Sequence, residues 1–528
     1  MDQLISHRAK LKTMFKWPLF LLAAIAAFGQ GSDVSSSRIR PHVKYLASDL
    51  LEGRGVGTRG GELAASYIAS QFEAAGLKPA GDNGTYFQKV SLVGVEPQAT
   101  SSLSARKDGI TVPFKWLDNF VGNSQQQKQA APFMAEAVFA GHGISAPEFG
   151  WSDYDGIDVK GKVVVLFTNE PPSTDENFFD ARALTYYGRW TYKYEEATRR
   201  GAIACIILHT TPTAGYGWPV VRGSWGKEDP QVKLNPGEQA LAFAGWLTEE
   251  SSNQLLGMVG KNTAALLEAA NTKGFKAFPL GITIEGNIAA KIRPIETANV
   301  AGIVPGSDAV LAKEAIIISA HWDHLGISVP VNGDAIYNGA VDNATGCAMI
   351  IEMARAWAAL GRKPKRSALF IAVTAEESGL RGSEYYAKHP LWPPAKTLLN
   401  LNFDSFYPFG RVKDVVVTGA EKTKYFPQVE EAARRFSLKI KPDPEPEQGH
   451  YFRSDHFSFN KAGIPAFSIN MGNDYAGKPA DFGNTVFVQY NEKNYHNPSD
   501  EYKDDWDFAG IEQMARFGFT IGVNVSNR

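Results

Sequence analysis

The chain has 528 residues, of which 44% are hydrophobic and 21% charged, and its formal net charge of −2 comes from 54 basic and 56 acidic residues. These values are typical of globular proteins, and at about 100–200 residues per domain the length predicts two to four domains. The balanced charge excludes the strongly basic surface that nucleic-acid binding requires. The two cysteines, Cys205 and Cys347, are too few for a disulfide framework or a cysteine metal site, and their apolar neighbours predict buried thiols.

The first 30 residues differ from the rest of the chain. Lys10, Lys12 and Lys16 precede an apolar run over residues 17–28, and small residues follow it. The apolar run is shorter than the ~20 residues that a membrane-spanning helix needs. Residues 1–30 are therefore predicted to be a cleaved signal peptide. We expect an exported protein, periplasmic or secreted, with no stable membrane insertion after cleavage.

The remaining sequence falls into three parts. Residues 38–127 begin with helical spacing over 42–51 and 62–75, and the glycines between them (Gly55, Gly57 and Gly60) follow a helix, which argues against a dinucleotide site and for a turn. Residues 128–290 contain short β-like segments, at 135–139, 162–167, 202–208 and 278–284, and no cluster of metal ligands. This middle part is predicted to be an inserted β-rich domain, and residues 291–528 are predicted to complete the first domain.

Strands and helices alternate in the last part. Strands are expected at 315–320, 368–374, 397–403, 414–418 and 464–470, and helices at 343–360, 382–388, 427–436 and 506–523. This alternation predicts an α/β fold in which helices sandwich a mixed, mostly parallel sheet. In such sheets, sites form beyond the carboxyl ends of the strands.

Acidic and histidine side chains follow three of these strands. His321 and Asp323 come after the first, Glu376 and Glu377 after the second, and Asp404 after the third. Two further candidates are Asp342, before a helix, and His496, in a loop ahead of the last helix. Imidazole and carboxylate ligands without thiolate favour zinc, with manganese or cobalt also suited to such a set.

The number of candidate ligands exceeds what one tetrahedral ion needs. Two ions about 3.5–4 Å apart, sharing one carboxylate, use the whole set and lower the pKa of a water between them. One carboxylate must stay free to take the proton of that water. Glu376 and Glu377 are adjacent and point in different directions, so that one can ligate while the other acts as base. His324, His450 and His456 are expected to be packing or hydrogen-bonding residues.

Six segments together resemble the co-catalytic zinc aminopeptidases, which belong with glutamate carboxypeptidase II-like and transferrin receptor-like peptidases. They are His-Trp-Asp-His-Leu-Gly (321–326), Gly-Ala-Val-Asp-Asn-Ala-Thr-Gly (339–346), Thr-Ala-Glu-Glu-Ser-Gly-Leu-Arg-Gly-Ser (374–383), Asn-Phe-Asp (402–404), Arg-Ser-Asp-His (453–456) and Tyr-His-Asn-Pro-Ser-Asp (495–500). Leu-Glu-Gly-Arg-Gly (51–55) is similar to the opening segment of that family. The middle part resembles an inserted protease-associated domain, through residues 146–151 and 158–162.

The resemblance implies roles for individual residues. It implies two Zn²⁺ ions, one held by His321 and Asp404 and the other by Glu377 and His496, with Asp342 bridging both. It also implies that Glu376 is the general base and then the acid, that Asp323 orients His321, and that Tyr475 supports the transition state.

The expected function is an exported zinc aminopeptidase that hydrolyses peptides with a free N-terminus through a metal-bridged hydroxide. A carboxypeptidase or dipeptidase on the same scaffold is a competing hypothesis, and it would need a basic pocket for which Arg381 and Arg453 are candidates. Two more hypotheses are a glutaminyl cyclase-like enzyme with one zinc and a binding protein without catalytic activity. The sequence does not predict the preferred N-terminal residue, the oligomeric state or the role of the middle part.

Overall fold

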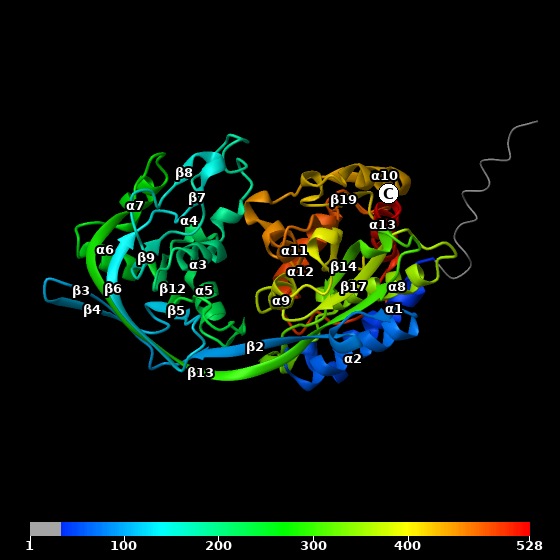
Figure 1. The fold of residues 1–528 in the computed structure, drawn as a ribbon, viewed down its shortest axis with the longest axis horizontal. Helices are drawn as coiled ribbons and strands as arrows, with labels where there is room; N and C mark the ends of the chain where they lie inside the picture. The colour runs from blue at the N-terminus through cyan, green and yellow to red at the C-terminus, as the bar shows by residue number, and fades with distance from the viewer. Residues whose placement is uncertain (1–32) are drawn as a thin grey trace, which may run out of the picture.

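A computed structural model describes residues 33–528, so the predicted signal peptide lies outside the described residues. The described chain forms two lobes, each built around its own β-sheet, and one long strand, β13 (Phe278–Val304), contributes to both (Figure 1). Within residues 33–528, no helix combines the length and the apolar character needed to cross a bilayer.

The first lobe contains a mixed sheet whose central strands are parallel. β14 is parallel to both β17 and β18, and β18 is parallel to β21, whereas β13 and β19 run antiparallel to their neighbours β17 and β21. Across the sheet the order is β11 (Asp229–Val232), β2 (Phe87–Pro97), β13, β17 (Ser367–Val373), β14 (Ala315–His321), β18 (Thr397–Phe403), β21 (Ala466–Met471), β19 (Asp414–Val416) and β20 (Lys439–Lys441).

Helices cover both faces of this sheet because its central strands are apolar on both sides. In β14, Ile316 and Ile318 pack into one buried core and Ile317 packs into the other. The larger core lies under α1 (Ser36–Leu46), α2 (Arg59–Ala74), α8 (Thr345–Ala358) and α13 (Ala509–Ser526). The opposite core lies under α9 (Arg381–Lys388) and α11 (His456–Lys461). Alternate side chains of one strand thus pack against the two helix layers on opposite faces of the sheet. The predicted α/β sandwich is confirmed.

The second lobe has its own core and its own sheet. The strand order is β4 (Ile110–Phe114), β3 (Ser102–Lys107), β13, β6 (Ala130–Phe139), β9 (Val163–Leu166), β10 (Ala204–Leu208), β12 (Phe243–Leu247) and β5 (Phe120–Asn123). Its helices are α3 (Trp190–Arg199), α4 (Thr211–Ala214), α5 (Trp218–Trp225), α6 (Glu249–Gly257) and α7 (Thr263–Ala270). The core of this lobe draws on residues from Leu103 onward. The assignment of residues 128–290 to an inserted domain stays a prediction.

Several elements were not expected from the sequence. β13 continues far beyond residue 284, β2 pairs with it along 11 residues, and α12 (Phe482–Lys493) precedes the last helix; α10 (Phe426–Phe436), in contrast, matches the helix expected at 427–436. A hairpin of β15 (Gly326–Val331) and β16 (Asp334–Tyr337) follows His324. The second half of β13 is hard to recognise because Lys291, Arg293 and Pro294 are exposed in it, so it lacks a regular apolar alternation.

Arg54 joins the N-terminal segment to the loops that follow β14 and β16. Its side chain is 1% exposed and its guanidinium donates hydrogen bonds to the carbonyl oxygens of Trp322, Leu46, Asn338 and Gly339 at 2.6–2.9 Å. Burial lowers the pKa of Arg54, and the nearby Cys347 and Asp342 oppose this shift. Four carbonyl acceptors around one buried cation hold both loops in place.

We predict that Arg54→Met destabilises the protein by on the order of 3–5 kcal/mol, because the carbonyl oxygens lose their donors inside the protein. Urea unfolding measures this change, and Arg59→Met, which removes an exposed arginine from α2, is the control. Equal stability of the two variants would contradict the structural role of Arg54.

His142 is a buried histidine of the second lobe. Its side chain is 1% exposed, and its Nε2 lies 2.8 Å from Asn271 Oδ1. Burial, with a smaller contribution from the charge of Lys193, lowers the pKa of His142 to about 4. The folded state therefore binds fewer protons than the unfolded state between about pH 6.5 and pH 4. This group contributes stability above that range, and the contribution is lost as the pH falls through it.

We expect the free energy of unfolding of His142→Gln to depend less steeply on pH than that of the unchanged protein. Between pH 7 and pH 4, the free energy of unfolding of the unchanged protein should fall by about 3 kcal/mol more than that of the variant, as measured by urea unfolding. The exposed His389, replaced by Gln, is the control. A pH-independent difference would argue against a neutral buried His142.

Candidate metal centre

Three parallel strands bring the first candidate ligands to one edge of the sheet. β14 ends at His321, β18 is followed by Asp404, and β17 is followed by Glu376 and Glu377. The register pairs His321 with Val373 of β17 and Ser319 with Asn402 of β18. The carboxyl ends of the three strands therefore lie side by side, which is where sites form in such sheets.

Two loops complete the cluster. Asp342 lies just ahead of α8, and His496 lies between α12 and α13. The loops are tied together, because the carboxylate of Asp500 accepts hydrogen bonds at 3.1 Å from the backbone N–H groups of Val341 and Asp342. Asn343 links the start of α8 to the other side of the site, since its side chain donates to Phe403 O at 3.0 Å and accepts from Ser405 N at 3.2 Å.

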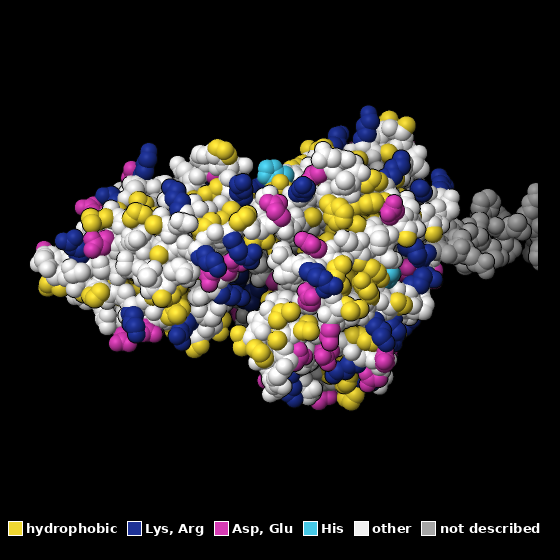
Figure 2. Space-filling model, turned by 90° about the horizontal axis from the view of Figure 1, so that it is seen from below, with side chains coloured by type: hydrophobic (Ala, Val, Ile, Leu, Met, Phe, Trp, Pro, Cys, Tyr) yellow, Lys and Arg dark blue, Asp and Glu magenta, His cyan; other side chains and the backbone are white. Residues whose placement is uncertain are grey.

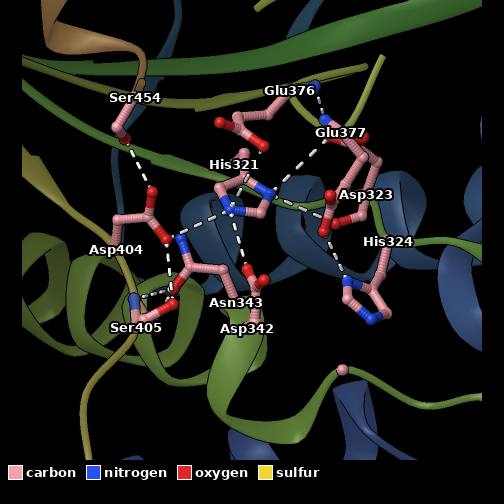
Figure 3. Close-up of polar contacts among 12 residues, drawn as sticks. His321, Asp323, His324, Asp342, Asn343, Glu376, Glu377, Asp404, Ser405 and Ser454 are labelled. Atoms are coloured by element: carbon pink, nitrogen blue, oxygen red, sulfur yellow. Dashed lines mark hydrogen bonds and ion pairs between the residues drawn. The ribbon is translucent and has the colours of Figure 1, made fainter. Parts of the chain in front are cut away.

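The side chains form two overlapping groups around Asp342 (Figure 3). In the first, His321 Nε2 lies 3.2 Å from Asp342 Oδ1 and 3.2 Å from Asp404 Oδ1. The second consists of His324, Asp342 and Glu377, and His496 lies beside it, with Nε2 3.4 Å from Asp342 Oδ2 and 3.0 Å from Glu377 Oε2. All five residues predicted as metal ligands are thus brought together, with Asp342 between the two groups.

His324 is a member of the second group. Its Nδ1 lies 2.6 Å from Glu377 Oε1, and its buried Nε2 has no hydrogen-bond partner among the described residues. The sequence predicted a packing or hydrogen-bonding histidine here, whereas the structure places it where it could also be a metal ligand. Its nearness to Asp342 and Glu377 could be expected from its position three residues after His321, in the same loop.

The cluster concentrates negative charge with few cations to offset it. Among residues 33–528, the only ion-pair partners of Asp342, Glu376, Glu377 and Asp404 are the histidines described above. Burial raises the pKa of Glu376 well above its usual value, and nearby carboxylates add to this effect. Burial also raises the pKa of Glu377, but the charges of His496 and His324 outweigh it and hold the pKa at about 2.

Backbone conformation next to the ligands is unusual. Ala375, Ser405 and His496 have positive φ values of 54°, 57° and 54°, in the left-handed region that non-glycine residues seldom adopt. Ala375 precedes Glu376 and Ser405 follows Asp404. Strained conformations of this kind persist where the surrounding structure fixes them, and they occur often at functional sites.

Asp323 holds the backbone of the two glutamates, and Glu376 lies beside the ligand groups. The carboxylate of Asp323 accepts from the backbone N–H groups of Glu376 and Glu377 at 3.1 and 3.3 Å, and its Oδ1 lies 3.9 Å from His321 Nδ1. The carbonyl oxygen of Asp323 is closer to the same nitrogen, at 3.2 Å. Glu376 lies above the imidazole of His321, with Oε2 4.0 Å from Nε2, and outside both ligand groups (Figure 3).

The two tyrosines near the site differ in their surroundings. Tyr475 is 2% exposed and its ring contacts Phe409 and Phe482, so its predicted role in catalysis stays a prediction. Tyr495 is 47% exposed and stacks on His496 with ring centroids 3.9 Å apart. Partial burial raises the pKa of Tyr495, and the carboxylates of Asp342 and Glu377 raise it further. No role was expected for Tyr495 from the sequence, although its adjacency to His496 was a signal that could have identified it.

The residues of the cluster fit zinc. Imidazole nitrogens and carboxylate oxygens are zinc ligands, and largely buried carboxylates this close together need a cation to offset their repulsion. The histidines alone leave an excess of negative charge.

Comparison with known proteins agrees with this chemistry. Residues 299–517 match the sequence profile of "Peptidase family M28". The chain is 30% identical over 205 residues to "Leupeptin-inactivating enzyme 1" of Streptomyces exfoliatus, covering 37% of this chain and 41% of that protein. It is 32% identical over 127 residues to a "Probable zinc metalloprotease" of Pyricularia oryzae, covering 23% and 24%. The chain therefore spans less than half the length of these relatives.

Among solved structures, "Aminopeptidase from Aneurinibacillus sp. strain AM-1" aligns over 94% of both chains with 20% identity and a TM-score of 0.49. A zinc aminopeptidase from Bacillus subtilis aligns over 93% of this chain and 94% of its own, with 17% identity and a TM-score of 0.41. The profile match covers His321, Asp342, Glu376, Glu377, Asp404 and His496. Residues 299–517, which carry the whole cluster, thus match the model of peptidase family M28.

Proposed function

We propose that the protein is a zinc aminopeptidase that binds two ions and releases N-terminal residues from peptides. His321 and Asp404 would hold one ion, Glu377 and His496 the other, and Asp342 both. The observation that carries this proposal is the division of the ligands into two groups that share Asp342, none of which forms an ion pair with a lysine or arginine of the described residues. The proposal includes export, because residues 1–30 have the pattern of a signal peptide.

The chain supplies groups for each requirement of peptide hydrolysis. Zinc, when bound, provides Lewis-acid chemistry that polarises a carbonyl oxygen and lowers the pKa of water. Glu376 takes the proton of the attacking water and passes it to the leaving amine, as expected for a carboxylate beside the ligand groups but outside them. The Tyr495 hydroxyl is available to donate a hydrogen bond to the oxyanion.

The surrounding residues keep the ligands in place. Ser454 Oγ donates to Asp404 Oδ2 at 2.6 Å, and the Asp323 carboxylate holds the backbone of both glutamates. Such contacts orient ligands and are as important as the ligands themselves. Asp500 does the same for Asp342 from the loop that carries His496.

A substrate with a free amino terminus is the proposed class, because segments 321–326, 339–346 and 374–383 resemble those of the co-catalytic zinc aminopeptidases. N-blocked and free peptides with the same scissile bond test this proposal directly. Faster hydrolysis of the blocked peptides would instead favour a carboxypeptidase, and cyclisation of N-terminal glutamine with one zinc per chain would favour a glutaminyl cyclase-like enzyme.

We expect Glu376→Gln to keep two zinc ions per chain and to lower kcat by about 10²–10⁴-fold, because it removes the proton acceptor and no ligand. Asp342→Asn should lose zinc together with activity, because it weakens the residue shared by both groups. Metal analysis and turnover of an aminoacyl p-nitroanilide measure both effects. Near-normal turnover of Glu376→Gln, or full zinc content in Asp342→Asn, would contradict these roles.

Tyr495 and Tyr475 form a matched pair for testing oxyanion stabilisation. Tyr495→Phe should lower kcat by about 10²-fold with little change in KM, because it removes a hydrogen bond made in the transition state. Tyr475→Phe removes the same atom from a buried aromatic cluster. The geometry therefore predicts a much smaller effect on kcat there. The reverse result would restore the role that the sequence assigned to Tyr475.

A further inference from the structure

Several histidines of this protein lie inside the folded chain. On the face of the molecule drawn in Figure 2, histidine side chains are few and isolated. Those that the structure buries are His142, His209, His321, His324 and His456. A buried imidazole needs a hydrogen-bond partner or a ligand, because an unpaired polar group is costly to remove from water. His324 lies inside the candidate metal centre without being one of the five predicted ligands.

The imidazole of His324 makes one hydrogen bond within residues 33–528, and its partner is a predicted ligand. Its Nδ1 lies 2.6 Å from Glu377 Oε1, and the side chain of His324 is 0% exposed. An ionised carboxylate can only accept hydrogen bonds, so the proton of this bond is carried by Nδ1. A protonated ring nitrogen has no lone pair for a metal ion. In this structure His324 is therefore a donor to Glu377.

The two carboxylate oxygens of Glu377 face different histidines. Oε1 accepts the hydrogen bond from His324, whereas Oε2 lies 3.0 Å from His496 Nε2. The same nitrogen of His496 lies 3.4 Å from Asp342 Oδ2. The hydrogen bond from His324 thus fixes the rotation of the Glu377 carboxylate and leaves Oε2 directed toward the other two ligands. Oε2 is the oxygen available to an ion held by Asp342, Glu377 and His496.

The imidazole of His324 has little freedom to turn away. Gly339 covers one edge of the ring, because a Cβ atom at that position would come within 2.5 Å of His324 Cγ. Gly339 also has a φ of 57°, in the left-handed region that favours glycine. The backbone N–H of His324 donates to Arg54 O at 3.3 Å, and Arg54 Nη2 donates to Gly339 O at 2.9 Å. Arg54 therefore holds both the residue that carries the imidazole and the glycine that covers it.

A direct ligand role for His324 is the alternative, because it has a nitrogen within 4.8 Å of ligand atoms of Asp342 and Glu377. The distances distinguish the two roles. Two atoms that bind one tetrahedral zinc ion at about 2.0–2.1 Å are about 3.3 Å apart. The four contacts between predicted ligands described above are 3.0–3.4 Å long, as this geometry requires. The 2.6 Å contact of His324 is shorter and has the length of a charge-assisted hydrogen bond.

We propose that His324 is a positioning residue, which donates a hydrogen bond to Glu377 and so orients this carboxylate for the ion shared with Asp342 and His496. The inference rests on the proposed function for the presence of two zinc ions. It assigns His324 to one ion only, because within the described chain no hydrogen bond or ion pair joins its imidazole to His321 or Asp404. Hydrogen-bond partners of metal ligands typically change metal affinity by about 10–100-fold.

Three substitutions of His324 separate hydrogen bonding, packing and direct ligation. The amide nitrogen of asparagine lies about where Nδ1 of histidine lies, whereas that of glutamine extends to the position of Nε2. We expect His324→Asn to bind both zinc ions with nearly the affinity of the unchanged protein, because it keeps a donor beside Glu377. His324→Gln and His324→Leu should each weaken the binding of one zinc ion by about 10–100-fold and leave the other unchanged.

Titration of the metal-free full-length protein with zinc, against a competing chromophoric chelator, measures both affinities without any turnover. Asp404→Asn and Glu377→Gln each remove a ligand of one ion and show which ion His324 affects. His324→Leu should weaken the ion that remains in Asp404→Asn and have no effect on the ion that remains in Glu377→Gln. The same substitutions of His142, which is buried in the second lobe, are the matched controls. Melting temperatures confirm that the variants fold.

Unchanged zinc affinities in all three His324 variants would overturn the proposal and leave this histidine a packing residue. Equal losses in His324→Asn, His324→Gln and His324→Leu would also overturn it, because they would identify a direct ligand. A protein that binds two zinc ions with the expected differences, but hydrolyses no peptide, would lose the proposed peptidase function and keep the role of His324. A protein that binds no zinc would overturn both proposals.

Discussion

Mutual repulsion among buried carboxylates is the constraint on which the organisation of the first lobe depends. Asp342, Glu376, Glu377 and Asp404 come from separate segments and meet at one edge of the sheet. Side chains of this kind separate unless the backbone holds them, and here it is held by Asp323, Asn343 and Asp500 through hydrogen bonds to main-chain groups. The favourable burial of the apolar strands on two faces supplies the stability that this arrangement requires.

The residues that hydrogen-bond to the candidate ligands, or to the loops that carry them, come from distant parts of the chain. Arg54, near the N-terminus, fixes the loops that carry Asp323 and Asp342, and Asp500, near the C-terminus, fixes the backbone of Asp342. The segment that contains Ser454 is in turn packed against the second lobe through Phe452 and Phe457. The metal centre is therefore supported by nearly the whole described chain, although its ligands lie within residues 321–496.

Much of the first lobe could be predicted from sequence because its strands are short, apolar and followed directly by ligands. The strand over residues 397–403 has the expected bounds, and β14 and β17 differ from expectation by about one residue. β2 and the second half of β13 could not be predicted, because they pair with each other across about 200 residues of sequence and the second half of β13 lacks a regular apolar alternation. Tyr495 was not singled out, although it directly precedes His496, because its stacking on that ring depends on the folded backbone.

The continuity of β13 has a consequence for how the length of this protein can change. Successive side chains on a strand point to opposite faces of the sheet. Inserting one residue between the two sheets would therefore move every later side chain of the strand to the other face. Ile295 would then lose its buried position, Val300 and Ala301 would exchange the two buried faces of the sheet, and the pairing with β17 would slip. Within this strand, insertions and deletions should therefore involve an even number of residues or be compensated by a β-bulge. The loops of either lobe can change length without this restriction.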